Sequence, residues 1–342
     1  MVSTFEATPN IALIKYWGKR DSKLVLPQNS SISFTLGNSV KTVTSVLFSD
    51  RLKEDVAWLN RKKTSGEELA RMLLIADLVR QKASISSKVA IASENNFPTA
   101  AGIASSASGF AALACAASDA AGLGLNPTEL SILARMASGS ACRSVLGGFV
   151  EWKKGEEKDG GDSHAVQIAP ASHWPELHDL IAVAESGRKK IGSSAGMDRT
   201  VKTSGLYAKR ILDLPSRIAK MRQAIMLRDS QTVFALSMED SMNMHATMLD
   251  TKPPILYLNE RSMGIIEAIE ELNASEGKLV CGYTFDAGPN AHLICEGKDV
   301  AKVKKSVAKL HGIEKFYDCI VGAGPIKLAA KESLLSEAGK PV

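Results

Sequence analysis

Residues 98–108 have the sequence PTAAGIASSAS, and they open a stretch to residue 121 that consists almost entirely of Ala, Gly and Ser. Alanine has the highest intrinsic helix propensity, and Gly122 is a typical residue just after a helix end. The composition therefore predicts a helix of small residues over 99–121. A helix without bulky side chains can approach a sheet or a ligand closely.

The start of this predicted helix is a candidate phosphate-binding site. A loop with Gly102 leads into residues that include Ser105, Ser106 and Ser108. The first backbone N–H groups of a helix have no partner within it, and the helix dipole adds partial positive charge at that end. Both effects favour a bound anion. An ordinary, tightly packed helix is the alternative, and these residues alone favour neither.

Two well-known nucleotide-binding signatures are absent from the sequence. There is no G-x-x-x-x-G-K-[ST] and no G-x-G-x-x-G, and the nearest match, Gly122-Leu123-Gly124, continues with Leu-Asn-Pro. That continuation indicates a helix end. P-loop and dinucleotide-binding folds are therefore disfavoured.

Helices and strands are predicted along the rest of the chain without strict βαβ alternation, which favours the α+β class. Asn126, Pro127 and Glu129 have the order of an N-cap, a first-position proline and an acidic first turn, so a helix should follow to about residue 136. Hydrophobic periodicity predicts further helices over 67–82, 205–227, 232–248, 261–273 and 300–311, and strands over 42–48, 88–92, 148–152, 180–184, 279–284, 291–295 and 319–322.

Composition and the absence of targeting signals disfavour several classes of protein. The chain has 342 residues and a net charge of +5, with Lys and Arg interspersed among Asp and Glu, which disfavours a nucleic-acid binder. We find no signal peptide and no apolar stretch long enough to span a bilayer. The five cysteines have no C-x-x-C spacing, which indicates neither a zinc site nor a disulfide framework. We expect a cytoplasmic protein with reduced cysteines.

Three further segments carry candidate chemistry. Residues 10–20, NIALIKYWGKR, combine three cations with two aromatic rings. Residues 138–143, SGSACR, combine hydroxyls with a guanidinium that can hold a carboxylate or phosphate through two hydrogen bonds. Residues 283–291, YTFDAGPNA, place one carboxylate between an apolar strand and a Gly-Pro turn. Each also has an ordinary explanation: a basic strand end, a surface turn, and an Asp that caps a turn.

Together, these segments resemble the motifs of the mevalonate diphosphate decarboxylase family, within the GHMP kinase superfamily. The matching segments are 10–20, 27–33, 95–110, 138–148 and 283–291, with further similarity at 193–197 and 245–254. They occur in the family's order and at similar spacing, so the resemblance covers nearly the whole chain. The segment 102–108 alone would indicate only the superfamily.

The resemblance implies a two-lobed α+β fold with a deep active-site cleft. The expected lobes are an N-terminal domain over 1–184, similar to ribosomal protein S5, and a ferredoxin-like domain over 185–342. The implied reaction converts (R)-mevalonate 5-diphosphate and ATP to isopentenyl diphosphate, ADP, phosphate and carbon dioxide, in isoprenoid and sterol biosynthesis. The resemblance also implies Mg²⁺ and a homodimer, with no nucleic-acid or membrane partner.

The resemblance assigns roles to individual residues. Asp286 matches the aspartate that orients or deprotonates the C3 hydroxyl, Arg143 matches the arginine that holds the substrate carboxylate, and Lys15 matches the lysine beside the aspartate. A lysine there would keep Asp286 ionised, so Asp286 should act mainly by orientation and late proton acceptance. The expected substrate-binding residues are Tyr16, Trp17, Gly18, Lys19, Arg71, Ser138, Gly139, Ser140, Ala141, Cys142, Arg143, Ser193, Ser194 and Met197, and the expected ATP-binding residues are Pro98, Ala101, Gly102, Ala104, Ser105, Ser106 and Ser108.

Several functions stay open at this point. The chain could be a kinase for the C3 hydroxyl of mevalonate, a decarboxylase for mevalonate monophosphate, or a non-catalytic metabolite-binding module. The combination of Lys15, Arg143 and Asp286 favours the decarboxylase over the kinase. Lys19 and the serines favour a diphosphate substrate. The sequence predicts no protein ligands for Mg²⁺, which we expect beside the ATP phosphates and near Ser106.

Overall fold

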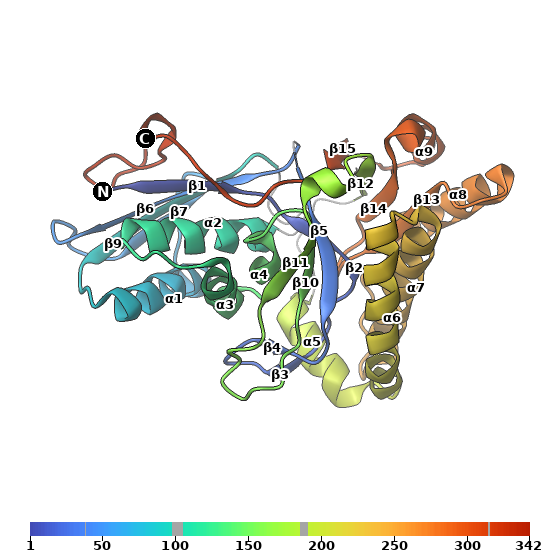
Figure 1. Ribbon diagram of the computed structural model, residues 1–342, viewed down its shortest axis with the longest axis horizontal. Coiled ribbons are helices and arrows are strands. Elements are labelled where there is room, and N and C mark those ends of the chain that lie inside the picture. The colour runs from blue at the N-terminus through green and yellow to red at the C-terminus, as the bar shows by residue number, and fades with distance from the viewer. Residues whose placement is uncertain (38, 98–104, 185–190, 314) are drawn as a thin grey trace.

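The computed structural model describes residues 1–37, 39–97, 105–184, 191–313 and 315–342. Helices and strands are mixed along the chain, and the predicted α+β class is confirmed (Figure 1). The described helices of four or more residues are α1 (Gly66–Ala83), α2 (Ser105–Ala120), α3 (Pro127–Ala137), α4 (Ala141–Ser144), α5 (Ser193–Thr203), α6 (Tyr207–Leu227), α7 (Ser230–Leu249), α8 (Glu260–Glu276) and α9 (Val300–Val307).

The strands form three main sheets and one short ribbon. The first sheet has the order β16 (Ile326–Lys327), β1 (Ser3–Ala7), β6 (Thr42–Ser49), β9 (Lys88–Asn95), β7 (Val56–Leu59) and β8 (Lys62–Lys63). The second has the order β11 (Ala165–Ala169), β10 (Phe149–Trp152), β5 (Ser31–Thr35) and β2 (Asn10–Ile14). The third has the order β13 (Cys281–Phe285), β14 (Ala291–Glu296), β12 (Leu177–Val183) and β15 (Lys315–Ile320), and the ribbon pairs β3 (Lys19–Asp21) with β4 (Leu26–Pro27).

The small-residue helix α2 lies against the first sheet, where it contacts β1 and β6 (Figure 1). Ala107, Ala111 and Ala114 are fully buried, so the backbone of α2 can approach the strands closely. A shared core also contains residues of α1 and α3, such as Ile75 and Ala134. The prediction that small residues allow close packing on a sheet is confirmed.

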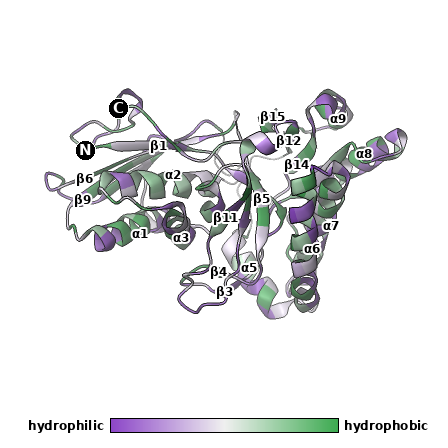
Figure 2. Cartoon of the chain, viewed as in Figure 1, coloured by the Kyte–Doolittle hydropathy of each residue, from purple (hydrophilic) through white to green (hydrophobic). Residues whose placement is uncertain are grey.

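The largest core cluster joins the two halves of the chain. It contains Ile11 and Phe34 from the second sheet together with Ile181, Ile294 and Tyr317 from the third. Helices α6 and α7 run side by side and both contact β2 (Figure 1). In Figure 2, hydrophilic colour lies on the loop between β10 and β11, which is rich in Lys, Glu and Asp.

The predicted boundary between residues 184 and 185 would leave β12 with the N-terminal half. However, β12 pairs with β14 and β15 of the C-terminal half. In the other direction, β16, near the C-terminus, pairs with β1 at the N-terminus. A division into two domains stays a prediction, and the pairing of β12 favours a boundary before Leu177.

Most predicted elements are present, with shifted ends. The capping box of α3 is confirmed: Asn126 Oδ1 accepts from the Glu129 N–H at 3.1 Å, and Gly122 adopts a positive φ of 71° after α2. The predicted helix over 300–311 ends at Val307, because the chain turns before Gly312, where φ is 84°. The predicted strand over 319–322 is Lys315–Ile320, because its pairing with β12 covers those residues.

Gly282 is the point at which α7 touches β13, and it provides a test of this packing. An added Cβ would lie 2.8 Å from Cα of Phe234 on α7, so the helix or the strand would have to move. We expect Gly282→Ala to lower the free energy of unfolding by about 1–3 kcal/mol, as measured by urea denaturation. Gly124→Ala is the matched control, because an added Cβ there meets no atom within 4 Å. Equal stability of both variants would contradict this packing.

Candidate active site

Lys15 and Asp286 form an ion pair between distant parts of the chain. Lys15 directly follows β2, Asp286 directly follows β13, and Lys15 Nζ lies 2.7 Å from Asp286 Oδ1. The Lys15 side chain is 2 % exposed, whereas that of Asp286 is 33 % exposed. The carboxylate is therefore held on its buried side and is accessible on the other. A tight turn follows, because the Gly288 N–H donates to the Asp286 carbonyl at 2.8 Å.

Arg143 carries a buried positive charge that is held by neutral groups. Its Nε donates to Asn10 Oδ1 at 3.0 Å, and its Nη1 donates to Ser31 Oγ at 2.8 Å. Within the described ranges, no carboxylate lies within ion-pair distance of Arg143. Burial lowers the pKa of the guanidinium, while the nearby charge of Asp286 opposes that shift. A buried cation without an acidic partner is costly, and a carboxylate-bearing ligand would relieve that cost.

The segment after Lys15 is fixed by packing. The Trp17 side chain is buried beside Met197, and its Nε1 donates to Thr200 Oγ1 at 3.0 Å. Gly18 has a φ of 101°, and the Tyr207 hydroxyl, which donates to the Trp17 carbonyl at 2.7 Å, fills the space that a side chain would need. The side chains of Trp17 and Met197 therefore shape the site by packing.

The predicted turn at Ser138-Gly139-Ser140 connects this region to α2. The Ser138 hydroxyl donates to Ser106 Oγ at 3.3 Å, and Asn10 Nδ2 donates to the Ser140 carbonyl at 3.0 Å. Gly139 is required by space, because a Cβ there would come within 2.9 Å of Tyr16 and Trp152. A chain of polar contacts thus runs from the start of α2 to Asn10.

Tyr16, Ala141 and Cys142 surround this turn. The Tyr16 and Trp152 rings are 4.6 Å apart, and burial raises the pKa of the Tyr16 hydroxyl. Ala141 and Cys142 start the short helix α4, which the sequence did not predict, and both are fully buried. Burial raises the pKa of the Cys142 thiol to about 12, so the thiol stays protonated at neutral pH. All five cysteines are free and buried.

Lys19, Ser193 and Ser194 come together at the start of α5. Lys19 Nζ donates to Ser194 Oγ at 2.5 Å and lies 3.8 Å from Asp198 Oδ1. The Lys19 side chain is 8 % exposed. Helix α5 was not among the helices predicted from the sequence.

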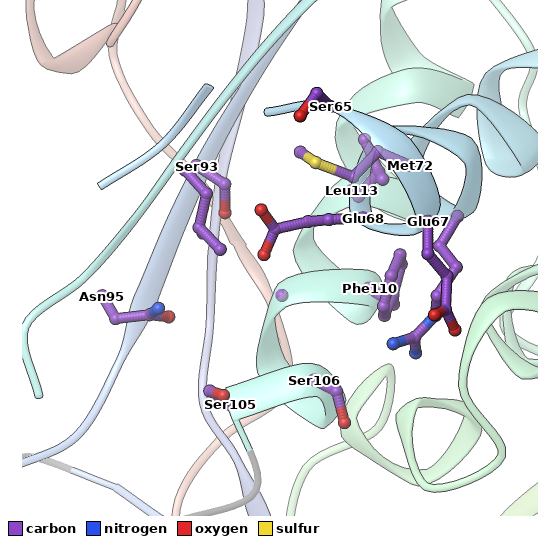
Figure 3. Close-up of a pocket in the computed structure, with 13 residues that line it drawn as sticks. Ser65, Glu67, Glu68, Met72, Ser93, Asn95, Ser105, Ser106, Phe110 and Leu113 are labelled. Atoms are coloured by element: carbon purple, nitrogen blue, oxygen red, sulfur yellow. The ribbon is translucent and has the colours of Figure 1, made fainter. Parts of the chain in front are cut away.

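A pocket of about 540 Å³ lies between α1, α2 and β9 (Figure 3). Leu59, Met72, Phe110 and Leu113 provide apolar walls, and Glu67, Glu68, Ser93 and Asn95 add polar groups. Ser105 and Ser106, at the first turn of α2, lie at one end of the pocket (Figure 3). Sequence analysis did not identify the wall residues, because they come from four separate segments and match no nucleotide signature.

Arg71 lies in this pocket. Its guanidinium stacks 4.7 Å from the centre of the Phe110 ring and donates to the Ala137 carbonyl at 2.9 Å. Burial lowers the pKa of Arg71. A role in binding a diphosphate stays a prediction.

Ser108 points elsewhere. It is fully buried, its Oγ lies 2.6 Å from Thr42 Oγ1 on β6, and it does not line the pocket. A role of Ser108 in binding ATP stays a prediction. The remaining predicted ATP-binding residues, Pro98, Ala101, Gly102 and Ala104, lie outside the described residues.

His245 on α7 is a buried histidine beside the ion pair. It is 3 % exposed, and its ring lies 6.4 Å from the Phe285 ring, edge to face. Burial, assisted by the positive charge of Lys15, lowers the pKa of His245 to about 4. His245 is therefore uncharged near neutral pH.

No metal-binding cluster of three or more His, Cys, Asp or Glu side chains occurs in the described ranges. This is compatible with Mg²⁺, which usually keeps several waters and uses one or two carboxylates together with substrate phosphates. Glu68 and the Ser106 hydroxyl supply oxygen atoms in the pocket. No helix in the described residues is long and apolar enough to cross a membrane.

Comparisons with known proteins agree over most of the chain. Residues 7–165 match the diphosphomevalonate decarboxylase-like N-terminal domain, and residues 179–339 match the mevalonate 5-diphosphate decarboxylase C-terminal domain. Diphosphomevalonate decarboxylase from Debaryomyces hansenii is 46% identical over 330 residues, which cover 92% of this chain and 85% of the relative.

Solved structures agree with the sequence comparisons. Mevalonate diphosphate decarboxylase from Trypanosoma brucei has a TM-score of 0.90 at 35% identity, over 98% of this chain and 100% of that one. A solved complex of MDDEF with MVAPP, AMPPCP and magnesium has a TM-score of 0.88 at 36% identity, over 96% of this chain and 99% of that one.

The burial of His245 predicts a stability difference with pH. In the unfolded chain His245 binds a proton below about pH 6.5, whereas in the folded protein its pKa is about 4. The free energy of unfolding of the wild type should therefore fall, relative to that of His245→Gln, as the pH decreases from 6.5 to 4. The total difference should reach about 3 kcal/mol.

Urea denaturation at a series of pH values measures this difference. Lys15 and Asp286 face His245, and both are unchanged in the variant. His311→Gln is the control, because His311 is exposed. Parallel pH curves for the wild type and His245→Gln would show that His245 titrates normally in the folded protein.

Proposed function

The chain belongs to the diphosphomevalonate decarboxylase family, and from this premise we propose that Asp286, Lys15 and Arg143 form the reaction centre. The chain is an ATP-dependent decarboxylase that converts (R)-mevalonate 5-diphosphate to isopentenyl diphosphate, with ADP, phosphate and carbon dioxide as the other products. The assignment of these three residues to the reaction centre rests on one observation. The 2.7 Å contact between Lys15 and Asp286 joins positions 271 residues apart, and the Asp286 carboxylate stays partly accessible.

The first step phosphorylates the tertiary C3 hydroxyl of the substrate. The C3 oxygen forms a bond to the γ-phosphorus of ATP, the bond from that phosphorus to the bridging oxygen of ADP breaks, and the hydroxyl proton passes to Asp286. The Lys15 ammonium, 2.7 Å from Asp286 Oδ1, favours the charged form of the carboxylate and orients it toward the substrate hydroxyl. Positioning and electrostatic stabilisation are the main contributions to phosphoryl transfer.

The second step removes phosphate and carbon dioxide. The bond from C3 to the phosphorylated oxygen breaks, and the electron pair of the bond to the substrate carboxyl group forms the new carbon–carbon double bond. We assign the substrate carboxylate to Arg143, whose buried guanidinium has neutral partners in Asn10 and Ser31. A planar guanidinium can form two parallel hydrogen bonds with a carboxylate and so fix its plane.

We assign the pocket between α1, α2 and β9 to ATP. Its volume and its mixture of apolar walls with a few polar groups are typical of small-ligand sites. The adenosine would lie between Leu59, Met72 and Phe110, with the phosphates directed to Ser105 and Ser106 at the first turn of α2. The solved MDDEF complex, which contains AMPPCP and magnesium, supports this assignment.

Mg²⁺ is the expected cofactor, and when bound it neutralises charge on the ATP phosphates. The chain's own contribution to this region is a pair of hydroxyls on Ser105 and Ser106 and free N–H groups at the first turn of α2. The contact from Ser138 to Ser106 places the pocket next to the turn that leads to Arg143.

We assign the diphosphate end of the substrate to a separate polar group. This group combines one cation with several hydroxyls, around the start of α5 and the turn before α4. Its members are Tyr16, Lys19, Ser138, Ser140, Ser193 and Ser194. Lys19 supports a diphosphate, because it is largely buried and points its ammonium at Ser194.

We also propose a cytoplasmic location and a homodimer. Five free, buried cysteines support a reducing compartment. The exposed side chains of Leu212 and Leu227 on α6 support an interface with a second copy, since they are 79 % and 69 % exposed in a single chain.

The role of Asp286 is tested by Asp286→Asn. Removal of the proton acceptor should lower kcat by about 10²–10⁴-fold while ATP binding persists. The measurement is ATP-dependent release of carbon dioxide from mevalonate, its 5-phosphate and its 5-diphosphate, with ADP formation followed in parallel. Asp318→Asn is the control, because Asp318 is an exposed residue that pairs with His178. Substantial residual activity of Asp286→Asn would refute the assignment.

The same assay separates the alternative functions. A decarboxylase for the diphosphate releases carbon dioxide from mevalonate 5-diphosphate only. Preference for the 5-phosphate would identify a monophosphate decarboxylase, and ADP formation without carbon dioxide would identify a kinase.

The nucleotide pocket is tested by Gly109→Leu. Gly109 lines the pocket, and an added Cβ there meets no atom within 4 Å, so a leucine side chain would extend into the open space. The KM for ATP should rise at least about tenfold, whereas the stability of the fold should be unchanged or higher because leucine favours helix over glycine. Gly109→Ala is the control, and its KM for ATP should stay near that of the wild type. An unchanged KM in Gly109→Leu would place ATP elsewhere.

A further inference from the structure

Helix α7, which packs against β2 and β13, has a row of fully buried polar side chains. Ser237, Asp240 and Ser241 are all completely buried. Ser237 bonds within its own helix, because its hydroxyl donates to the Val233 carbonyl at 2.7 Å. Asp240 and Ser241 instead accept hydrogen bonds from backbone groups outside the helix. Such bonds are expected where a helix side chain fixes another segment.

Asp240 fixes the backbone of Lys15. Its Oδ2 accepts the Lys15 N–H at 2.7 Å. Arg210 holds the same carboxylate through both oxygens, at 2.9 and 3.0 Å, and Arg217 approaches Oδ1 at 3.3 Å. The Lys15 carbonyl is held from the other side by Asn29 Nδ2 at 2.9 Å. The peptide groups on both sides of the Lys15 Cα therefore have fixed partners.

Ser241 fixes the backbone beside Asp286. Its Oγ accepts the Phe285 N–H at 2.9 Å, and Phe285 is the residue directly before Asp286. In the described part of the chain, β2 and β13 are edge strands of two different sheets, so no strand-to-strand pairing sets their separation. Two adjacent residues of α7 therefore reach the two strand ends that carry the ion pair.

We propose that Asp240 and Ser241 are positioning residues that set the geometry of Lys15 relative to Asp286. The proposal rests on the proposed function, because it requires that this pair acts in the reaction. The paired charges of Arg210 and Arg217 matter here, since they neutralise the buried carboxylate of Asp240. The Lys15 ammonium consequently remains with Asp286. A displacement of about 1 Å in reacting groups can lower a rate about 10²-fold.

The test compares Ser241→Ala with Ser237→Ala. Both changes remove one hydroxyl from a fully buried serine on the same face of α7, but only Ser241→Ala frees the N–H of Phe285. We expect kcat of Ser241→Ala to fall at least about tenfold, with the KM values for ATP and mevalonate diphosphate within about twofold of the wild type. Ser237→Ala should keep wild-type kcat. Equal kcat values for the two variants, or a change in KM alone, would overturn the proposal.

A second measurement separates positioning from a general loss of stability. In the Asp286→Asn background, Ser241→Ala should cause no further decrease in the remaining rate, because the group that it positions is already gone. An equal decrease in both backgrounds would indicate a merely structural role and overturn the proposal. The wild type is assayed alongside, so a failure of the proposed function would appear separately, as absence of carbon dioxide release from the wild type.

Discussion

The ion pair between Lys15 and Asp286 constrains how the rest of the molecule can be arranged. An ammonium that is 2 % exposed has lost almost all of its hydration, and a nearby carboxylate must compensate for that loss. The two residues follow strands of different sheets, so the second and third sheets must meet with a fixed offset. The common core of Ile11, Phe34, Ile181 and Ile294 provides that contact. The packing of the core and the ion pair of the site therefore require the same arrangement of the second and third sheets.

The charged groups around this ion pair are distributed so that they do not compete with Asp286 for the Lys15 ammonium. Asp240 lies directly behind the Lys15 backbone, but its charge is matched by Arg210 and Arg217. Arg143 lies nearby, and in the described part of the chain its hydrogen-bond partners are an amide and a hydroxyl, which do not carry a compensating charge. A buried guanidinium in this state attracts an anion much more strongly than a solvated one. The substrate carboxylate thereby completes an electrostatic arrangement that the protein alone leaves incomplete.

Sequence reasoning predicted elements that depend on local physics and missed those that depend on distant contacts. The capping box at Asn126 and the small-residue helix α2 follow from propensity and capping, and both are present. The strand β2 was missed because all of its residues are buried, so it shows no alternation. Helix α5 was also missed, and its Met197 packs in one cluster with the distant Trp17.

In the candidate site, too, the sequence alone did not identify the residues whose roles depend on distant contacts. Asp286 and Arg143 were identified through resemblance, since each has an ordinary local explanation as a turn cap or a surface arginine. Asp240 and Ser241 gave no sequence signal, because a buried Asp or Ser on a helix cannot be told from a solvated one without the partner strands. Ser108 was predicted from its position at the start of α2, and the structure adds that its hydroxyl bonds to Thr42 in the core.

The pairing of β1 with β16 has a consequence for how the chain is made. β1 includes Phe5 and Glu6, which pair with Lys327 and Ile326, so one edge of the first sheet is completed only by the last part of the chain. During synthesis on the ribosome, which proceeds at about 5–20 residues per second, that edge stays uncovered until β16 has been translated. An open strand edge can pair with other chains. Nascent molecules of this protein are therefore exposed to misassembly at this edge until β16 emerges from the ribosome, and they would benefit from chaperones that bind the N-terminal sheet.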